Sequence, residues 1–352
     1  MAERAAAPEG PLTGDLPEVL AERLAAMGEP PYRARQLFRA FHAEGRLDPQ
    51  SITTLPAALR ERLAQEAPPA TTLKEAQEAA DGTTKLLLGL ADGRAVESVL
   101  IPENDRVTVC VSTQVGCPIR CIFCASGVRG LLRNLTPAEI VEPLIHARAR
   151  LGKRPTHIVL MGMGEPLLNL DAVVQAIRIW THPDGMGMSP RRITVSTALT
   201  PQRIDALAAA DLGVNLAVSL HAPDDVTRAE LVPGSPVGRV KALVEAAARF
   251  ATTTRRDATV EYVLIDKLND QPAHAEALAD VLEGLPIHVN LIPFNPVSHR
   301  PDLAPPSGLA ATGFARRLAE RNVSVTLRTQ RGEDIAAACG QLALERALGE
   351  DD

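Results

Sequence analysis

Aromatic residues, net positive charge and long apolar runs are all scarce in this sequence. Phe, Trp and Tyr make up only 3% of the 352 residues, so we expect no extended aromatic platform for stacking nucleic-acid bases. The net charge is −6, whereas nucleic-acid-binding domains usually carry a basic excess. Any contact with a nucleic acid must therefore come from local basic patches.

No stretch of about 18 consecutive apolar residues occurs, so we expect no membrane-spanning helix. Residues 1–14, MAERAAAPEGPLTG, carry early acidic residues and no apolar core. We therefore expect a flexible N-terminal tail and no signal peptide. Together these features predict a cytoplasmic protein without a membrane partner, and we expect it to be a monomer.

Cysteine is rare outside one short segment. The chain has five cysteines, of which three lie within the eight residues CPIRCIFC. An odd and clustered set without a secretion signal argues against a disulfide framework and favours metal binding or catalysis. The five residues are Cys110, Cys117, Cys121, Cys124 and Cys339.

Residues 15–68 have apolar residues at helical spacing in LPEVLAERLAAMG, PYRARQLFRAFHAEG and LPAALRERLAQ. They predict a small helical accessory domain that binds RNA through a partly basic surface, although a solvated helix face explains its arginines equally well. Residues 69–107 predict a linker with a short β-hairpin, which turns at Asp92-Gly93 and places Glu97 in its second strand.

From 108 to 342, strand patterns alternate with helical patterns, which predicts an α/β fold with a parallel sheet, open or closed into a barrel. Six units are clear, fewer than a full eight-unit barrel, so we expect a partial (β/α)6 barrel. A late strand at 323–329 predicts a C-terminal extension, and 343–352 predicts a tail. The six expected strands are 107–113, 157–162, 193–197, 215–220, 258–265 and 288–294.

Each expected strand runs into a polar or glycine-rich segment. In parallel α/β folds the carboxyl ends of the strands form the site, so these six segments predict a single cavity. The segments are STQVGC, GMGEP, STALTP, SLHAPDD, DKLND and PFNP.

The cysteine triplet could bind either structural zinc or an iron–sulfur cluster. Structural zinc uses four ligands, and no nearby histidine completes this set. A [4Fe-4S] cluster held by three thiolates leaves one iron open, where S-adenosylmethionine (SAM) can bind and be cleaved to a radical. The C-x3-C-x2-C spacing of Cys117, Cys121 and Cys124, with Phe123 before the last cysteine, resembles the radical SAM superfamily.

MGMGEPLLN, which follows the second barrel strand, resembles the motif that contacts the SAM amino group in that superfamily. A strand-ending turn alone would account for Gly162 and Gly164, but it leaves Glu165 unexplained.

Taken singly, Cys110 and Cys339 would each be small apolar core residues. Six motifs in order, however, resemble the RlmN/Cfr family of RNA adenine methyltransferases over about residues 15–342, and they imply a partial radical SAM barrel. The sequences of segments 231–240 and 328–332 differ from those usual in the family. The motifs are CVSTQVGC, GLLRNLTPAEIV, MGMGEPLLN, SLHAPDD, NLIPFNP and RGEDIAAACGQL.

The resemblance implies a reaction that uses two SAM molecules per turnover. Cys339 would take a methyl group from the first, and cleavage of the second would activate that methyl group for addition to an adenine carbon. Glu97 would accept the proton that leaves this carbon. Cys110 would then attack Cys339, release the product and leave a transient disulfide.

The resemblance also implies the residues that contact SAM. For His221 alone, a hydrogen-bonded turn histidine is the competing interpretation. The residues are Gly164, Glu165, Ser196, Ser219, Leu220, His221 and Asn295.

The implied substrates are 23S rRNA and tRNA, methylated at C2 of adenine, with flavodoxin or ferredoxin as the electron donor. Methylation at C8 or another RNA target is the alternative within the family. Outside it, a glycyl-radical activase would need the triplet but not Cys110, Cys339 or Glu97, and an electron carrier would not need a SAM pocket. Candidate phosphate contacts are Arg33, Arg35, Arg39, Arg129, Arg133, Arg191, Arg192, Arg328 and Arg331.

Overall fold

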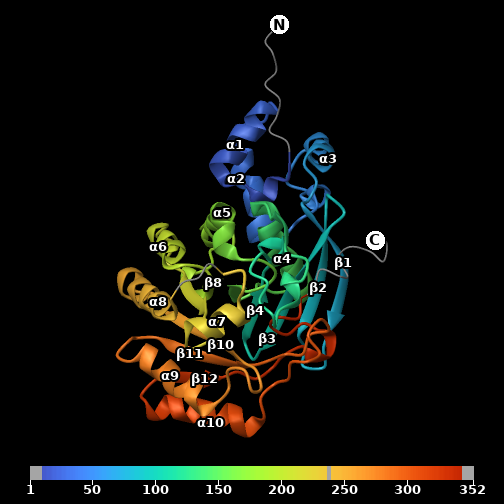
Figure 1. Cartoon of the computed structure of the whole chain (residues 1–352). Helices are drawn as coiled ribbons and strands as arrows, with labels where there is room; N and C mark the ends of the chain where they lie inside the picture. The colour runs from blue at the N-terminus through green and yellow to red at the C-terminus, as the bar shows by residue number, and fades with distance from the viewer. Residues whose placement is uncertain (1–9, 236–238, 343–352) are drawn as a thin grey trace.

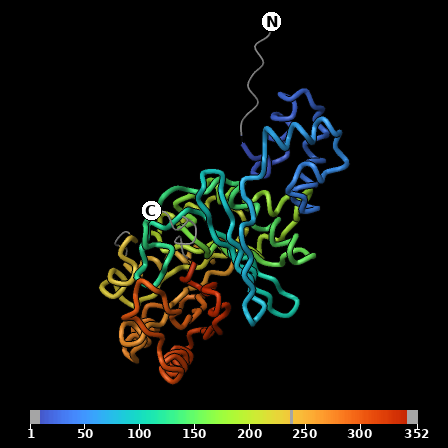
Figure 2. Tube along the Cα trace, turned by 90° about the vertical axis from the view of Figure 1, so that its right-hand side faces the viewer, coloured from blue at the N-terminus to red at the C-terminus, as the bar shows by residue number. Residues whose placement is uncertain are grey.

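The computed structural model describes residues 10–235 and 239–342. Three helices, α1 (Pro17–Ala26), α2 (Tyr32–Phe38) and α3 (Ala57–Glu66), form the N-terminal part, and α2 continues into a π-helical turn at Arg39–Ala43. Figures 1 and 2 show these helices at one end of the molecule. The expected tail 343–352, residues 1–9 and part of the divergent segment 231–240 lie outside the described residues.

A buried carboxylate joins the start of the chain to the barrel. Glu142 of α4 (Pro137–Leu151) accepts hydrogen bonds from the Thr13 hydroxyl at 2.6 Å and from the Thr71 main-chain N–H at 2.7 Å. The short 3-10 turn Leu12–Gly14 is buried within the segment expected to be a tail. The packing on α4 explains its order, and the proposed division into domains stays a prediction.

One sheet of ten strands runs through the remaining chain in the order β1-β2-β3-β4-β7-β8-β9-β10-β11-β12. Its first part is antiparallel, from β1 to β4. These strands are β1 (Thr71–Glu78), β2 (Thr84–Leu90), β3 (Ala95–Glu103) and β4 (Arg106–Cys110). The expected hairpin is β2–β3, but β1 was not expected, because its sequence TTLKEAQE has no regular apolar alternation.

Beyond β4 in the order of this sheet, the strands β7 to β12 pair in parallel and confirm the partial α/β barrel. The late strand β12 is not separate from the sheet, because it pairs in parallel with β11. The parallel strands are β7 (His157–Leu160), β8 (Ile193–Thr197), β9 (Asn215–Ser219), β10 (Ala258–Leu264), β11 (His288–Pro293) and β12 (Ser324–Leu327).

Amphipathic helices connect these strands and bury their apolar sides in one continuous core. Figure 1 shows α4, α5, α6, α8, α9 and α10 along the outer side of the sheet. In the described part of the chain, no helix is long and apolar enough to cross a membrane. The helices after α4 are α5 (Leu170–Thr181), α6 (Pro201–Ala209), α7 (Asp225–Leu231), α8 (Val240–Thr254), α9 (Pro272–Leu282) and α10 (Gly308–Glu320).

Candidate active site

The three clustered cysteines lie on a loop between two short strands, β5 (Gln114–Gly116) and β6 (Leu131–Asn134). The loop is tied to distant parts of the chain by main-chain hydrogen bonds. Ala125 N donates to Gly340 O at 2.8 Å, and Ile122 N donates to Leu231 O at 3.1 Å. The cysteine loop is therefore held between the end of α7 and the C-terminal segment.

Burial disfavours the charged form of these thiols. It raises the pKa of Cys117 to about 12, and it raises the pKa of Cys121 and Cys124 as well. The three are also close enough for charge on one to disfavour charge on another. Thiolates in such a place need a strong positive partner, which the irons of a cluster provide.

The number of thiols fits a cluster with one open iron. Three thiolates can each bind one iron of a [4Fe-4S] cluster, whereas structural zinc uses four ligands. Among residues 10–235 and 239–342, no group of three or more His, Cys, Asp or Glu side chains is arranged to hold a single metal ion.

The GMGEP loop packs tightly against the loop that follows β4. Gly164 has a φ of +103°, and a Cβ there would lie 2.6 Å from the Cβ of Gln114. The Glu165 N–H donates to Gln114 Oε1 at 2.8 Å, while its carboxylate accepts from the Ala198 N–H at 2.9 Å. Burial raises the pKa of Glu165 to about 7. A buried carboxylate near Cys117 is suited to bind an ammonium group.

Strands β8 and β9 bring two expected SAM contacts together. The hydroxyls of Ser196 and Ser219 are 3.3 Å apart, and Leu220 next to them is fully buried. His221 has a left-handed φ of 61°, and its Nδ1 accepts from the Val263 N–H at 3.1 Å. Burial lowers its pKa to about 3, so the ring is neutral with its proton on Nε2.

The ring of His221 also touches the cysteine loop. It packs edge-on against Phe123, with ring centroids 4.8 Å apart. The hydrogen bond to Val263 is the bond expected of a structural turn histidine. The Phe123 contact places this turn against the cysteine loop, and the contact of His221 with SAM stays a prediction.

Asn295 was expected among the SAM contacts, and its side chain holds the C-terminal segment. Its Nδ2 donates to the main-chain carbonyl of Cys339 at 2.9 Å, and its Oδ1 accepts from Gln330 at 2.9 Å. Its side chain is thus engaged on both sides within the protein.

Cys110 and Cys339, 229 positions apart in the sequence, come close in space. Charge on Cys339 disfavours charge on Cys110, and burial raises the pKa of Cys110 to about 12. Cys339 is accessible to solvent, yet the surrounding protein raises its pKa to about 11, and Cys124 is a further cause. All five thiols are free. Cys339 is therefore near both Cys110 and Cys124, and the next residue, Gly340, is hydrogen-bonded to the cysteine loop through Ala125.

Glu97 is buried on β3, beside Cys110 on β4. The Ser98 hydroxyl donates to the Cys110 carbonyl at 2.7 Å, and the Ser112 hydroxyl donates to the Glu97 carbonyl at 2.7 Å. Lys85 of β2 forms an ion pair with Glu97. Lys85 was not predicted as a site residue, although a lysine directly before the apolar run LLLGL is unusual enough to indicate one.

Arg228 is a second residue that sequence reasoning missed. It is 3% exposed, and its Nη2 donates to Ala198 O at 2.8 Å. Its charge acts on Cys121 and Glu165, and its Nε has no hydrogen-bond partner in the described part of the chain. A buried cation at this place favours anionic groups such as thiolates.

The arginines expected to contact phosphates fall into two groups. Arg33 donates to Gln36 at 2.7 Å, and Arg133 is bound by Asp92 and Glu139, so these two are engaged within the protein. The others stand at least partly exposed, although Arg35 pairs with Asp184 at 2.7 Å and Arg331 with Asp81 at 3.9 Å. They are Arg35, Arg39, Arg129, Arg191, Arg192, Arg328 and Arg331.

Comparison with known proteins agrees with this geometry. Residues 111–278 match the family model described as the radical SAM superfamily. The probable dual-specificity RNA methyltransferase RlmN of Parasynechococcus marenigrum is 46% identical, over 91% of this chain and 95% of its own. A protein of the same name from Thermus thermophilus is 45% identical, over 93% of this chain and 92% of its own.

A solved structure agrees over nearly the whole length. The radical SAM methyltransferase from Sphaerobacter thermophilus has a TM-score of 0.90 and 45% identity, covering 95% of this chain and 99% of its own. The superfamily uses a [4Fe-4S] cluster and SAM, which confirms the two expected cofactors. The chain therefore belongs to the RlmN family of the radical SAM superfamily.

Proposed function

We propose that this chain methylates C2 of adenine in 23S rRNA and in tRNA, through a methyl group carried on Cys339. The observation that carries the proposal is the hydrogen bond of 2.8 Å from Ala125 N to Gly340 O, which holds the segment of Cys339 against the cysteine loop. Charge on Cys339 and Cys110, and on Cys339 and Cys124, is also mutually unfavourable, as expected of thiols that lie near one another. A radical SAM enzyme without a thiol carrier has no need of these two additional cysteines. The relatives are named as dual-specificity RNA methyltransferases, which supports an RNA substrate.

Cys117, Cys121 and Cys124 would hold the cluster, with Arg228 balancing part of the negative charge. When bound, the cluster supplies the electron that cleaves SAM, and this is the source of the hydrogen abstraction that activates the methyl group. Glu165 and Gly164 would receive the SAM amino group. Residues Ser196, Ser219, Leu220, His221 and Asn295 would line the rest of the SAM site.

Three residues of this chain would act on the substrate side. Cys339 would carry the methyl group as a thioether and present it to the adenine carbon. Addition of the methylene radical would form the new carbon–carbon bond. Glu97 would accept the proton that this carbon then loses, while the adduct would give up one electron that the cluster would take back. The Cys110 thiolate would attack the Cys339 sulfur, so that an S–S bond forms, the S–CH2 bond breaks and the released carbon gains a proton. An external thiol would then reduce the disulfide.

The partners follow from this chemistry. We propose flavodoxin or ferredoxin as the one-electron donor, and a monomer as the active form. A transient disulfide that must be reduced in each turnover requires a reducing compartment, which supports a cytoplasmic location. The exposed arginines on the accessory helices and strand-end loops would bind RNA phosphates, so affinity for RNA should fall with salt.

Nucleoside mass spectrometry of 23S rRNA and tRNA tests the proposal, in cells with and without the gene. Loss of 2-methyladenosine from both RNA pools is the expected result. Loss from rRNA alone would restrict the substrate, and loss of 8-methyladenosine would move the reaction to the other carbon. Unchanged methyladenosines in both pools would refute an RNA substrate. Complementation with Cys339→Ala provides the control, because that variant retains the cysteine triplet.

A further inference from the structure

A buried lysine lies beside Glu97. Lys85 of β2 pairs through Nζ with Oε1 of Glu97 on β3 at 3.1 Å, and their side chains are only 6% and 3% exposed. In the antiparallel register Lys85 is opposite Val99 and Leu87 is opposite Glu97, so the pair is diagonal on one face of the sheet.

Stability alone does not account for this pair. Burial costs each charge several kcal/mol of hydration, and the mutual attraction does little more than offset that cost. Two apolar side chains of similar size would often stabilise a sheet as well or better. Lysine is also among the residues that are almost never fully buried unless paired. A function for the pair is therefore the better explanation.

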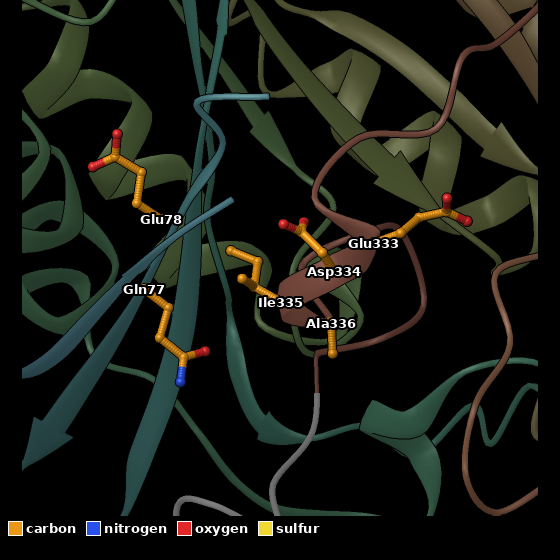
Figure 3. A pocket seen from close by; sticks show the side chains of 6 residues that line it. All are labelled: Gln77, Glu78, Glu333, Asp334, Ile335 and Ala336. Atoms are coloured by element: carbon orange, nitrogen blue, oxygen red, sulfur yellow. The ribbon is translucent and has the colours of Figure 1, made fainter. Parts of the chain in front are cut away.

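Lys85 makes a second contact, with the segment that carries Cys339. Its Nζ donates to the main-chain carbonyl of Ala336 at 3.3 Å. Ala336 has a left-handed φ of 51°, a conformation that is unfavourable for a residue with a Cβ and so needs support from its surroundings. Figure 3 shows Ala336 at the end of the segment Glu333–Ile335, across a groove from Gln77 of β1.

The same face of the sheet carries Cys110. Cys110 is opposite Val99, which is two residues along β3 from Glu97, so their side chains point to the same side. Three other titratable groups share this face of the sheet with Glu97. They are Glu75 of β1, Lys85 of β2 and Cys110 of β4.

We propose that Lys85 is a positioning residue, which fixes the Glu97 carboxylate, balances its charge and sets its place relative to the segment of Cys339. This inference rests on the proposed role of Glu97 as the base. A buried carboxylate without a cation prefers its neutral form, and a neutral carboxyl group cannot accept a proton. Lys85 acts through Glu97 and Ala336, and not on the adenine.

The test uses the full-length protein with its cluster reconstituted. It compares Lys85→Met and Lys85→Arg with Glu97→Gln and with Lys74→Met, which removes an exposed lysine from the neighbouring strand β1. Iron content and the mass of the Cys339 peptide report on the fold and on methyl loading. The rate of RNA methylation is then measured from about pH 6 to 9.

Lys85→Met should slow RNA methylation by at least about tenfold near neutral pH, with iron content and methyl loading retained. The acid limb of its pH profile should move to higher pH, because loss of the cation raises the pKa of the Glu97 carboxyl group. Lys85→Arg should restore most of the rate. Lys85→Gln, which keeps a donor for Ala336, replaces the Met variant if that one does not fold.

Two results would overturn the inference in different ways. In the first, Glu97→Gln loses activity, but the Lys85 variants keep the wild-type pH profile or Lys74→Met slows RNA methylation as much as Lys85→Met does. The positioning role of Lys85 would then be wrong, and the role of Glu97 as the base would stand. Full activity in Glu97→Gln would remove the proposed base, and the inference would fail with it. The proposed RNA methylation is tested by the wild-type protein, so neither of these results would refute it.

Discussion

Asn295 donates a hydrogen bond from Nδ2 to the main-chain carbonyl of Cys339, at 2.9 Å. Gln330 fixes the other end of the same amide, so the end of β11 and the C-terminal segment form one connected unit. In the proposed reaction Cys339 must meet SAM first and the adenine later. The position of its main chain therefore matters as much as the chemistry of its thiol.

Asn295→Ala should slow methyl transfer to RNA by about five- to tenfold, because one hydrogen bond to Cys339 of about 1 kcal/mol is lost. Mass spectrometry of the Cys339 peptide and the rate of RNA methylation measure the effect. Asn215→Ala is a matched control, since it removes a similar bond, to Arg191 O at 2.8 Å, at the opposite end of the parallel sheet. An equal loss in both variants would argue against a specific role of Asn295.

Cys110→Ala should keep the cluster and trap the product on the protein. Cys110 lies outside the triplet, so iron and sulfide content should match the wild type, whereas Cys121→Ala should lose the cluster. Without the attacking thiol, RNA should stay covalently bound to Cys339 and be visible as a shifted band on a denaturing gel. Free methylated RNA at the wild-type rate from Cys110→Ala would rule out the proposed release step.

The sequence alone was sufficient for the chemistry of the triplet, because the thiol spacing is local and each expected barrel strand has its own apolar run. The strand β1 could not be predicted in the same way. Its residues are mostly exposed, and its strand conformation comes from pairing with β2, which depends on tertiary structure.

The same distinction applies within the site. Glu97, Cys110 and Cys339 could be named from motifs, but their partners could not. Lys85 contacts Glu97, 12 positions away, and Asn295 contacts Cys339, 44 positions away. No local sequence pattern encodes such contacts. For Asn295 the motif predicts a SAM contact, which stays a prediction, but it does not predict the hydrogen bond to Cys339.

Gly164→Ala should abolish SAM binding or unfold the loop, for two reasons that a control can separate. The φ of +103° is strained for alanine, and the added Cβ would lie 2.6 Å from Gln114. Gly28 has a φ of +81° with no atom near its added Cβ, so Gly28→Ala carries the backbone strain without the clash. We expect Gly28→Ala to cost only about 1 kcal/mol of stability. Equilibrium dialysis with SAM and urea denaturation measure the two effects, and similar results for both variants would contradict the argument.

The last prediction concerns His42 of the accessory helices. Its side chain is fully buried and its ring lies beside that of Phe38. In the described part of the chain, neither ring nitrogen has a hydrogen-bond partner. Burial lowers the pKa of His42 to about 3. Between about pH 6.5 and 3 the unfolded chain therefore binds a proton here that the folded chain does not, so stability falls as the pH falls. His221 acts in the same direction, while Glu165, with its pKa raised to about 7, opposes it.

His42→Leu removes one of these protons and keeps an apolar side chain in the site. The free energy of unfolding of the variant should fall less steeply below about pH 6.5, by up to about 1.4 kcal/mol per pH unit. Near pH 8 both proteins have a neutral residue at this position, so urea denaturation there serves as the internal control. Parallel curves at all pH values would mean that His42 takes up its proton equally well in the folded and the unfolded protein. Water bound beside the ring would then have to supply the missing hydrogen-bond partners.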